Sequence, residues 1–294
     1  MRVTLATTYQ NMILNLNQKT EDADRLSNMI ASGKRISTPQ EDPQAWSQAM
    51  DLKQGLREIG AFQKNVDFAT TWNQTTVNAL SSFSNLLDQA IKTGTDAINN
   101  SEDRTSQIQT IDQISRQALD LANTQYQGLY IFSGRSLSTA SFDATTLDYQ
   151  GDTNDFEVRV GKNNLQAINI NGQSAFIQDP SDPDGSNILK RLAALKDALQ
   201  SGDMTEVQNQ TTALQSAQEY VGAQNSLAGL RLSYLDGQKS SLTTLNLNNT
   251  NQLSALEDTN SAEAITQMQQ NQTALQAAYQ VTGMLKDLSL VNYL

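Results

Sequence analysis

A heptad repeat runs through residues 52–98, which read LKQGLREIGAFQKNVDFATTWNQTTVNALSSFSNLLDQAIKTGTDAI. Positions alternately four and three residues apart are apolar in nine of fourteen cases, more than chance gives at 38% hydrophobic content. They are Leu52, Leu56, Ile59, Gln63, Val66, Thr70, Asn73, Val77, Leu80, Ser84, Leu87, Ile91, Gly94 and Ile98. This pattern predicts one helix from about Pro43 to Asn99, roughly 85 Å long, that packs lengthwise on another helix. Polar residues in the repeat, such as Asn73, either fix the register or lie where the seam is wet.

A shorter apolar stripe precedes this helix. It is formed within residues 5–32 by Met12, Leu16, Ala23, Leu26 and Ile30. Lys19 interrupts the stripe, and Gly33 stands where a helix-ending glycine is expected. Asp42 and Pro43 have the chemistry of an N-cap and a first-turn proline. Residues 33–42 are therefore predicted to form a joint between two helices.

The periodicity changes after a third predicted helix, Glu102 to Gln127. Apolar residues then occur in short alternating runs at Tyr149, Phe156, Val158, Val160, Ile168 and Ile170. The turn-forming segments that separate these runs are Gly151-Asp152, Gly161-Lys162-Asn163-Asn164 and Asn171-Gly172. Residues 131–186 are therefore predicted to be a small β insertion, closed by Pro180 and Pro183.

Helical patterning resumes at Asn187 and stops at Gly202. A second long helix is expected from about Asp203, with heptad positions at Met204, Val207, Leu214, Val221, Ala228, Leu232, Leu235 and Leu242. The polar residues 245–251 are its weakest part, and we expect a joint there that mirrors residues 33–42. A last helix follows.

The order of helices, β insertion and helices indicates a mainly α fold. We expect an elongated antiparallel hairpin of helical rods, because only this arrangement lets both halves bury their stripes against each other. The predicted domains are a terminal coiled-coil assembly domain (1–42 plus 251–294), a long helical rod (43–130 plus 187–250) and an outward-facing β insertion (131–186).

Composition excludes several classes of function. A net charge of −11 and a pI near 4.4 argue against nucleic acid or an anionic membrane as the main partner. The absence of cysteine and histidine removes disulfides, Ser-His-Asp triads and most zinc sites. The N-terminus has no secretory signal, and no apolar run approaches the ~20 residues of a membrane span. We expect a protein that is not an enzyme, with no catalytic residue, cofactor or metal.

The two terminal segments are the candidate functional site. Each is about 30–40 residues long with a broken apolar face, and helices of this kind depend on packing for their stability. Each exposed Leu, Ile or Val could gain about 1.5–3 kcal/mol on burial between subunits. The predicted assembly-interface residues are Met12, Leu16, Leu26, Ile30, Arg35, Ile36, Ile265, Met268, Leu275, Tyr279, Val281, Leu285, Leu288, Leu290 and Leu294. A coiled coil within one monomer fits the same heptads, so both interpretations stay open at this point.

Three other groups of residues partly resemble sites for calcium binding, phosphate binding or hydrolysis. Residues 179–185 resemble part of a calcium loop, but the first and last ligand positions of that motif do not match. Lys34-Arg35 lacks the glycine-rich loop of a phosphate site. Asp148, Asp152 and Asp155 could include a hydrolytic carboxylate pair, although acidic turn residues explain them more simply.

Motifs at both ends of the chain resemble the bacterial flagellin family. Those of the N-terminal half are Arg25-Leu26-Ser27, Ser32-Gly33-Lys34-Arg35-Ile36, Pro39 and Asp42-Pro43, with the opening Met1-Arg2-Val3-Thr4. The others are Tyr130-Ile131-Phe132-Ser133-Gly134, Tyr149-Gln150-Gly151-Asp152, Ala262-Glu263-Ala264-Ile265, Leu275-Gln276-Ala277 and the final Leu288-Ser289-Leu290-Val291-Asn292-Tyr293-Leu294. The proline followed by Asp-Pro is more similar to the hook–filament junction members than to the filament proteins.

The resemblance implies a structural role. Such proteins are exported through the flagellar type III apparatus and form a ring between the first hook-associated protein and flagellin. Expected partners are these two proteins, other copies of the chain, and an export chaperone that holds the C-terminal segment in the cytoplasm. The alternatives are a filament flagellin proper and a type III secreted helical effector.

Overall fold

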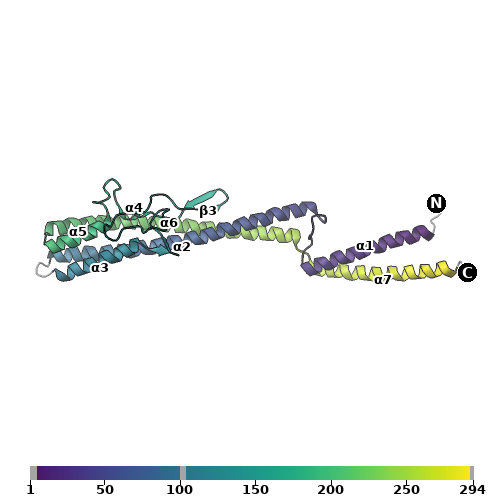
Figure 1. Cartoon of the computed structure of the whole chain (residues 1–294). Coiled ribbons are helices and arrows are strands. Elements are labelled where there is room, and N and C mark those ends of the chain that lie inside the picture. Colours follow the sequence, from purple (N-terminus) through teal and green to yellow (C-terminus); the bar gives the residue numbers. More distant parts are fainter. Residues whose placement is uncertain (1–4, 100–103, 292–294) are drawn as a thin grey trace. The chain divides into compact units, whose positions relative to one another are not determined.

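The chain is mainly helical, as predicted. The computed structural model describes residues 5–99 and 104–291, with the side chains of residues 7–99 and 104–284. The described part contains seven helices and two small antiparallel sheets (Figure 1). In chain order the elements are α1 (Leu5–Ser32), α2 (Pro43–Asn99), α3 (Thr105–Ala122), β1 (Gln125–Tyr126), β2 (Leu129–Tyr130), β3 (Glu157–Gly161), β4 (Asn164–Ala167), α4 (Gly172–Phe176), α5 (Ile188–Ser201), α6 (Met204–Glu257) and α7 (Ser261–Val291).

The chain divides into two compact units. We call Met1–Arg57 with Leu245–Leu294 the terminal unit, and Glu58–Thr244 the central unit. The three-domain division made from the sequence stays a prediction.

Local chemistry sets several helix ends at the predicted places. α1 ends where Gly33 takes a left-handed φ of 68° and its N–H donates to Met29 O at 2.9 Å. Asp42 Oδ1 caps α2 by accepting the N–H of Ala45 at 3.0 Å. α5 begins after the Asn187 cap and ends at Gly202, which has φ 75°.

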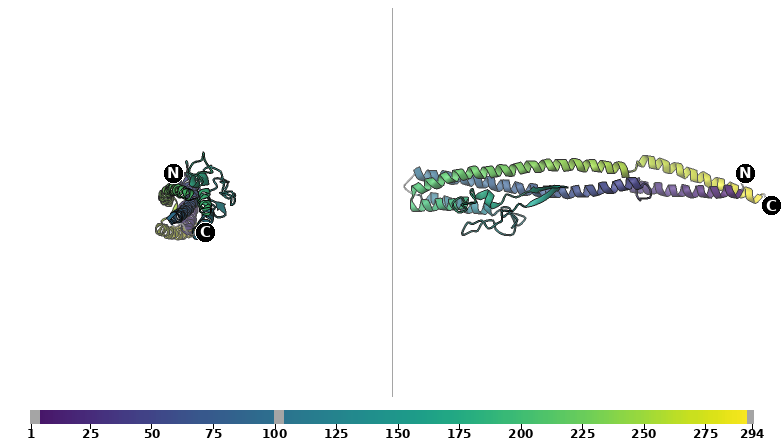
Figure 2. Two further views of the ribbon diagram at one scale, coloured as in Figure 1. Left: turned by 90° about the vertical axis from the view of Figure 1, so that its left-hand side faces the viewer. Right: turned by 90° about the horizontal axis from the view of Figure 1, so that it is seen from above.

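In the central unit α2 and α6 run antiparallel, and α3 packs on α5 (Figures 1 and 2). Three pairs mark the α2–α6 contact: Gln218 Nε2 to Asp88 Oδ1 (2.7 Å), Asn225 Nδ2 to Ser81 Oγ (3.0 Å) and Lys239 Nζ to Asp67 Oδ1 (2.8 Å). Residue numbers fall along α2 as they rise along α6, so the long helices pair as a hairpin.

The α2 heptad repeat faces the interior as predicted. All fourteen positions are buried or half-buried, and Val66, Leu80 and Leu87 are fully buried. Asn73 is also buried, and its Nδ2 donates to Ala69 O of its own helix at 3.0 Å. Because the side chain is buried, Asn73 does not lie in a wet part of the seam. Because the hydrogen bond stays within α2, that bond does not fix the register between helices.

The third helix is shorter than predicted. It was expected to reach Gln127, but α3 ends at Ala122 and a β1–β2 hairpin follows. Gln127 and Gly128 have φ of 52° and 81°. Two consecutive positive φ values make the type I′ turn that joins hairpin strands, so the turn geometry outweighs the helical preference of the sequence before it.

The β insertion has less regular strand than its alternating pattern predicts. β3 and β4 form a hairpin around Lys162 and Asn163, as expected. The predicted turn at Asn171-Gly172 is wrong, because Asn171 caps the short α4 by accepting the N–H of Ser174 at 2.8 Å. Ile168 and Ile170 are buried outside the strands. They are apolar because they belong to the core.

The joint expected at residues 245–251 is not there. α6 continues through this segment to Glu257. The segment contains no glycine or proline, and asparagine costs only a few tenths of a kcal/mol more than leucine in a helix. The chain leaves the helix at residues 258–260, where Asn260 O accepts the N–H of Ala264 at 2.9 Å at the start of α7.

Candidate assembly surface of the terminal helices

α1 and α7 lie side by side and antiparallel in the terminal unit (Figures 1 and 2). Thr259 N donates to Gly33 O at 3.0 Å, and Asn271 Nδ2 donates to Lys19 O at 2.8 Å, so residue numbers run in opposite directions. The seam is a heptad series. On α1 it includes Met12, Leu16, Ala23, Leu26 and Ile30, and on α7 Ala264, Met268, Asn271, Leu275, Ala278 and Thr282.

This seam is thin. Within the described part of the two helices, the only buried side chains are Leu26, Ala264 and Asn271. The other seam residues are half-buried, and Lys19 is exposed. Small or polar side chains occupy much of the α7 side. Since helix stability comes mainly from packing, this pair has little stability of its own.

Large apolar side chains remain exposed on both helices. On α1 they are Tyr9, Ile13 and Leu14, and on α7 Ile265, Tyr279, Val281 and Met284, with exposed fractions between 40% and 65%. Single exposed apolar residues are common, but a group on two adjacent helices is typical of an interaction surface.

The predicted interface residues fall into four groups. Six lie in the α1–α7 seam: Met12, Leu16, Leu26, Ile30, Met268 and Leu275. Ile265, Tyr279 and Val281 are exposed. Arg35 and Ile36 lie between α1 and α2. Leu285, Leu288 and Leu290 lie on α7 with side chains outside the described part, and Leu294 lies outside the described residues.

Sequence reasoning missed four of the exposed apolar residues: Tyr9, Ile13, Leu14 and Met284. They lie off the heptad stripe that was used to choose candidates. They could have been recognised in the sequence as large apolar residues at helical positions outside the heptad stripe.

A polar network joins the chain after α1 to the end of α6. Arg35 N donates to Glu257 O at 2.6 Å, and Arg35 Nη2 donates to Leu256 O at 2.8 Å. The buried carboxylate of Glu257 pairs with Lys53 and lies 3.6 Å from Lys34 Nζ. Lys34 and Arg35 are thus engaged within the chain.

Lys34 also pairs with Asp258 at 2.6 Å. The hydrogen bond to Asp258 raises the pKa of Lys34, and the same bond, followed by that from Ser254, lowers the pKa of Asp258. Both groups therefore stay charged over the neutral range, and the network holds the end of α6 and the adjoining Asp258 against the chain that follows α1.

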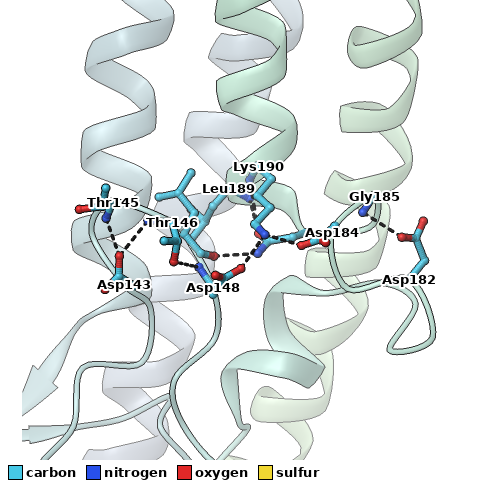
Figure 3. Close-up of polar contacts among 11 residues, drawn as sticks. Asp143, Thr145, Thr146, Asp148, Asp182, Asp184, Gly185, Leu189 and Lys190 are labelled. Carbon is cyan, nitrogen blue, oxygen red and sulfur yellow. Dashed lines mark hydrogen bonds and ion pairs between the residues drawn. The ribbon is translucent and has the colours of Figure 1, made fainter.

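The acidic clusters of the β insertion anchor loops. In Figure 3 Lys190 lies between Asp148 and Asp184, with Nζ 2.6 Å from Asp148 Oδ1. Asp143 Oδ1 accepts the N–H groups of Thr145 and Thr146 at 2.7 and 2.8 Å. Each of these carboxylates has a structural partner.

The carboxylates of Asp152 and Asp182 also accept hydrogen bonds within the insertion. Asp152 accepts the N–H of Arg135 at 3.1 Å and that of Asn154 at 2.8 Å. These bonds, that from Arg135 first, lower the pKa of Asp152 to about 2. In the loop that resembles a calcium motif, Asp182 Oδ1 accepts the N–H of Gly185 at 3.0 Å (Figure 3).

A search of the described helices found none with the length and hydropathy of a membrane span.

Comparison with known proteins relates the chain to flagellar components. Residues 4–136 match the family described as the bacterial flagellin N-terminal helical region. Over 99% of its length the chain is 26% identical to flagellar hook-associated protein 3 of Salmonella typhimurium, of which it covers 98%.

Two solved structures have a similar fold. FlgL of Bacillus cereus gives a TM-score of 0.61 at 23% identity, covering 69% of this chain and 98% of that one. The flagellar junction protein FlgL of Legionella pneumophila gives a TM-score of 0.59 at 16% identity, and the match covers 72% of this chain and 100% of that one. At such identities these structures show likeness of fold alone.

Proposed function

Because the chain belongs to the bacterial flagellin family and is related over nearly its whole length to flagellar hook-associated protein 3, we propose that it forms the junction between hook and filament. It is a structural subunit of the flagellum. In this role copies form a ring that has the first hook-associated protein on one side and the first layer of flagellin on the other.

The observation that carries the proposal is the exposed apolar surface of α1 and α7. Tyr9, Leu14, Tyr279 and Met284 are 45–65% exposed on a helix pair with a thin seam. Packing this surface between subunits would bury it, and each large side chain contributes about 1.5–3 kcal/mol when fully buried. Assembly would thereby supply the stability that the pair lacks alone.

The predicted interface residues have two roles in this proposal. Seam residues such as Leu26 and Leu275 hold α1 against α7, and outward residues such as Ile265, Tyr279 and Val281 contact neighbouring subunits. Leu285, Leu288, Leu290 and Leu294 extend the contact surface toward the C-terminus.

The protein works outside the cell in the flagellum and is proposed to arrive there by type III export. A cytoplasmic chaperone that covers the C-terminal segment before export would prevent premature association. No catalysis is proposed, since Asp148, Asp152 and Asp184 already have structural partners.

The test uses flagellated cells and purified protein. Cells that lack this chain should make hooks without filaments and lose flagellin to the medium. The purified protein should add a limited layer to isolated hooks that end in the first hook-associated protein. Continuous growth from filament seeds would instead identify a filament flagellin. A separable activity in the β insertion that survives loss of both ends would identify a secreted effector.

A further inference from the structure

A groove lies between α2 and the β3–β4 hairpin in the central unit, and we call it the hairpin groove. It has a volume of about 420 Å³ and is lined by Glu58, Ala61, Phe62, Arg159, Lys162 and Asn163. Its two walls differ in chemistry. The α2 wall contains the apolar Ala61 and Phe62, whereas the hairpin wall contains the cationic Arg159 and Lys162.

Hydrogen bonds from both long helices hold the hairpin in place. Asn65 Nδ2 of α2 donates to Arg159 O at 2.7 Å, and Gln238 Nε2 of α6 donates to Val160 O at 2.9 Å. Val160 is also buried, so the inner face of β3 is anchored in the core beside these helices (Figure 1). The hairpin groove is therefore formed before a partner binds, which removes part of the ordering cost of binding.

The two cations of the hairpin groove have no partner within the described part of the chain. Arg159 and Lys162 are exposed, and neither side chain makes an ion pair or a hydrogen bond with a described residue. By contrast, Lys190 and Lys239 of the same unit each pair with an aspartate. Glu58, the acidic residue of the groove, is already engaged in an interaction. The hairpin groove therefore has a local excess of positive charge in a chain whose net charge is −11.

Apolar side chains accompany these cations. Phe62 is half-buried, packs on the central core and lines the groove. Leu165 stands directly opposite Arg159 in the β3–β4 ladder and is 56% exposed. Opposite residues of an antiparallel pair share one face of the sheet, so Leu165 places a second apolar surface beside Arg159.

This combination of surfaces favours an acidic peptide segment over other anions. Nucleic acids and anionic membranes are bound through clusters of basic residues, which a chain of net charge −11 with two cations in the groove does not provide. A free phosphate would leave Phe62 and Leu165 uncovered. A peptide carboxylate can instead pair with the planar guanidinium of Arg159, while an apolar side chain of the same peptide covers Phe62.

We propose that the hairpin groove is a docking site for an acidic segment of a partner protein that also contains aromatic or aliphatic side chains. The carboxylates of this segment pair with Arg159 and Lys162, and one of its apolar side chains packs against Phe62. The surface belongs to the central unit and lies outside α1 and α7, so the proposal does not depend on the junction role.

The first test measures binding of a defined peptide to the full-length chain. The probe is a fluorescent synthetic peptide in which one phenylalanine is flanked by glutamates, and binding is followed by fluorescence anisotropy. We expect saturable binding that weakens as salt is added, because exposed ion pairs are screened. Replacing both cations, Arg159→Glu with Lys162→Glu, should lower the affinity at least about tenfold.

The matched control is Lys64→Glu with Lys92→Glu, which makes the same charge change at exposed α2 positions outside the groove. This variant should bind the peptide as the unchanged chain does. The proposal would be overturned by an absence of saturable binding, by an equal loss of affinity in the control variant, or by equally tight binding of a peptide with alanine in place of phenylalanine. Tighter binding of single-stranded DNA or of phosphatidylserine vesicles, lost in the Arg159 and Lys162 variant, would also overturn it.

The second test locates the bound peptide. Because the chain has no cysteine, Asn163→Cys provides a single attachment point for an environment-sensitive dye at the edge of the groove. Asp96→Cys provides the control at an exposed α2 position outside the groove. We expect the peptide to change the emission of the dye at position 163 and not that of the dye at position 96. Any result other than a larger response at position 163 would place the binding elsewhere and contradict the proposal.

Discussion

The two units of the chain differ in how they bury apolar side chains. In the central unit one continuous core extends from Ile59 to Leu242 and includes the fully buried rings of Trp72 and Phe83. In the described part of the terminal unit, the buried apolar side chains are Leu26, Ile36, Ala45, Ala49 and Ala264. Helices of similar periodicity thus have very different amounts of packing.

The difference separates folding from assembly. The central unit can stabilise itself, because its helices and β insertion cover one another's apolar surfaces. The terminal helices leave large apolar groups in water and so have stability to gain from partners. The predictions below test this contrast.

The largest effect on stability is expected from Phe83→Ala. The Phe83 ring lies 4.7 Å from that of Phe176, measured between centroids, in the core of the central unit. Its removal should lower the free energy of unfolding by about 3–5 kcal/mol in denaturant titrations. The matched change on α1, Tyr9→Ala, should cost less than about 0.5 kcal/mol. Equal losses from the two variants would contradict the contrast.

Leu275→Asp should affect assembly far more than folding. The half-buried Leu275 packs in the α1–α7 seam, where a carboxylate would be partly desolvated. Addition to hooks should be lost, while the denaturant midpoint of the central unit stays unchanged. Gln276→Asp places the same charge on an exposed neighbouring position and should assemble normally. Unfolding of the central unit by Leu275→Asp would show that the two units are not separable.

Limited proteolysis of the dilute chain should reveal the same boundary. We expect proteinase K, which cuts at many kinds of residue, to remove about the first 40 and last 45 residues first, because weakly packed ends open more readily. Mass spectrometry would identify a protected fragment that contains the central unit. If both ends resist as long as the central unit does, assembly is not needed to order them.

A smaller effect is expected from Glu257→Gln. The change removes the charge that pairs with Lys34 and Lys53, whose side chains are 43% and 35% exposed and can regain water. We expect a loss of about 1–2 kcal/mol in the stability of the terminal unit, and earlier cleavage between α6 and α7. Glu21→Gln, an exposed change on α1, is the control and should have no effect.

The smallest effect is a pH dependence at Asp152. Hydrogen bonds from the Arg135 and Asn154 N–H groups, with the Arg135 bond the largest cause, lower the pKa of Asp152 to about 2 in the folded chain, below its unfolded value near 3.9. Asp152 therefore contributes stability above about pH 4 that is lost as the pH falls toward 2.

Asp152→Asn should consequently be less stable than the unchanged chain at pH 7, and the difference should shrink by pH 3 in denaturant titrations. Asp24→Asn, an exposed α1 change, controls for net charge. A difference that stays constant with pH would contradict the assignment.

Features that depend on nearby residues were predictable. Gly33, Asp42, Asn187 and Gly202 set helix ends through hydrogen bonds or φ values within a few residues of themselves. The fold class followed because a long heptad repeat requires a helix to pack against. The candidate site was placed on the two terminal helices for the same reason, and its role in assembly stays a prediction.

Features that depend on distant contacts were not predictable. The polar residues 245–251 contain no breaker, and the chain instead turns after Glu257, where Lys34, Lys53 and Arg35 meet the end of α6. Those residues are about two hundred positions away in sequence, and nothing in the local pattern links them. Asn171 had the composition of a turn but serves as a helix cap within a folded insertion.

The heptads and helix ends by themselves determined that this chain is mainly helical and that its termini form amphipathic helices. Only the tertiary structure decided which apolar side chains of those helices are used within the subunit. Met268 and Leu275 face α1, whereas Ile265 and Tyr279 of the same helix remain exposed. All four side chains are apolar, and each lies three or four residues from another of the four, so the heptad pattern alone does not distinguish them. The side that becomes the seam depends on where the second helix lies, and that position is set by the contacts around Glu257 and Asn271.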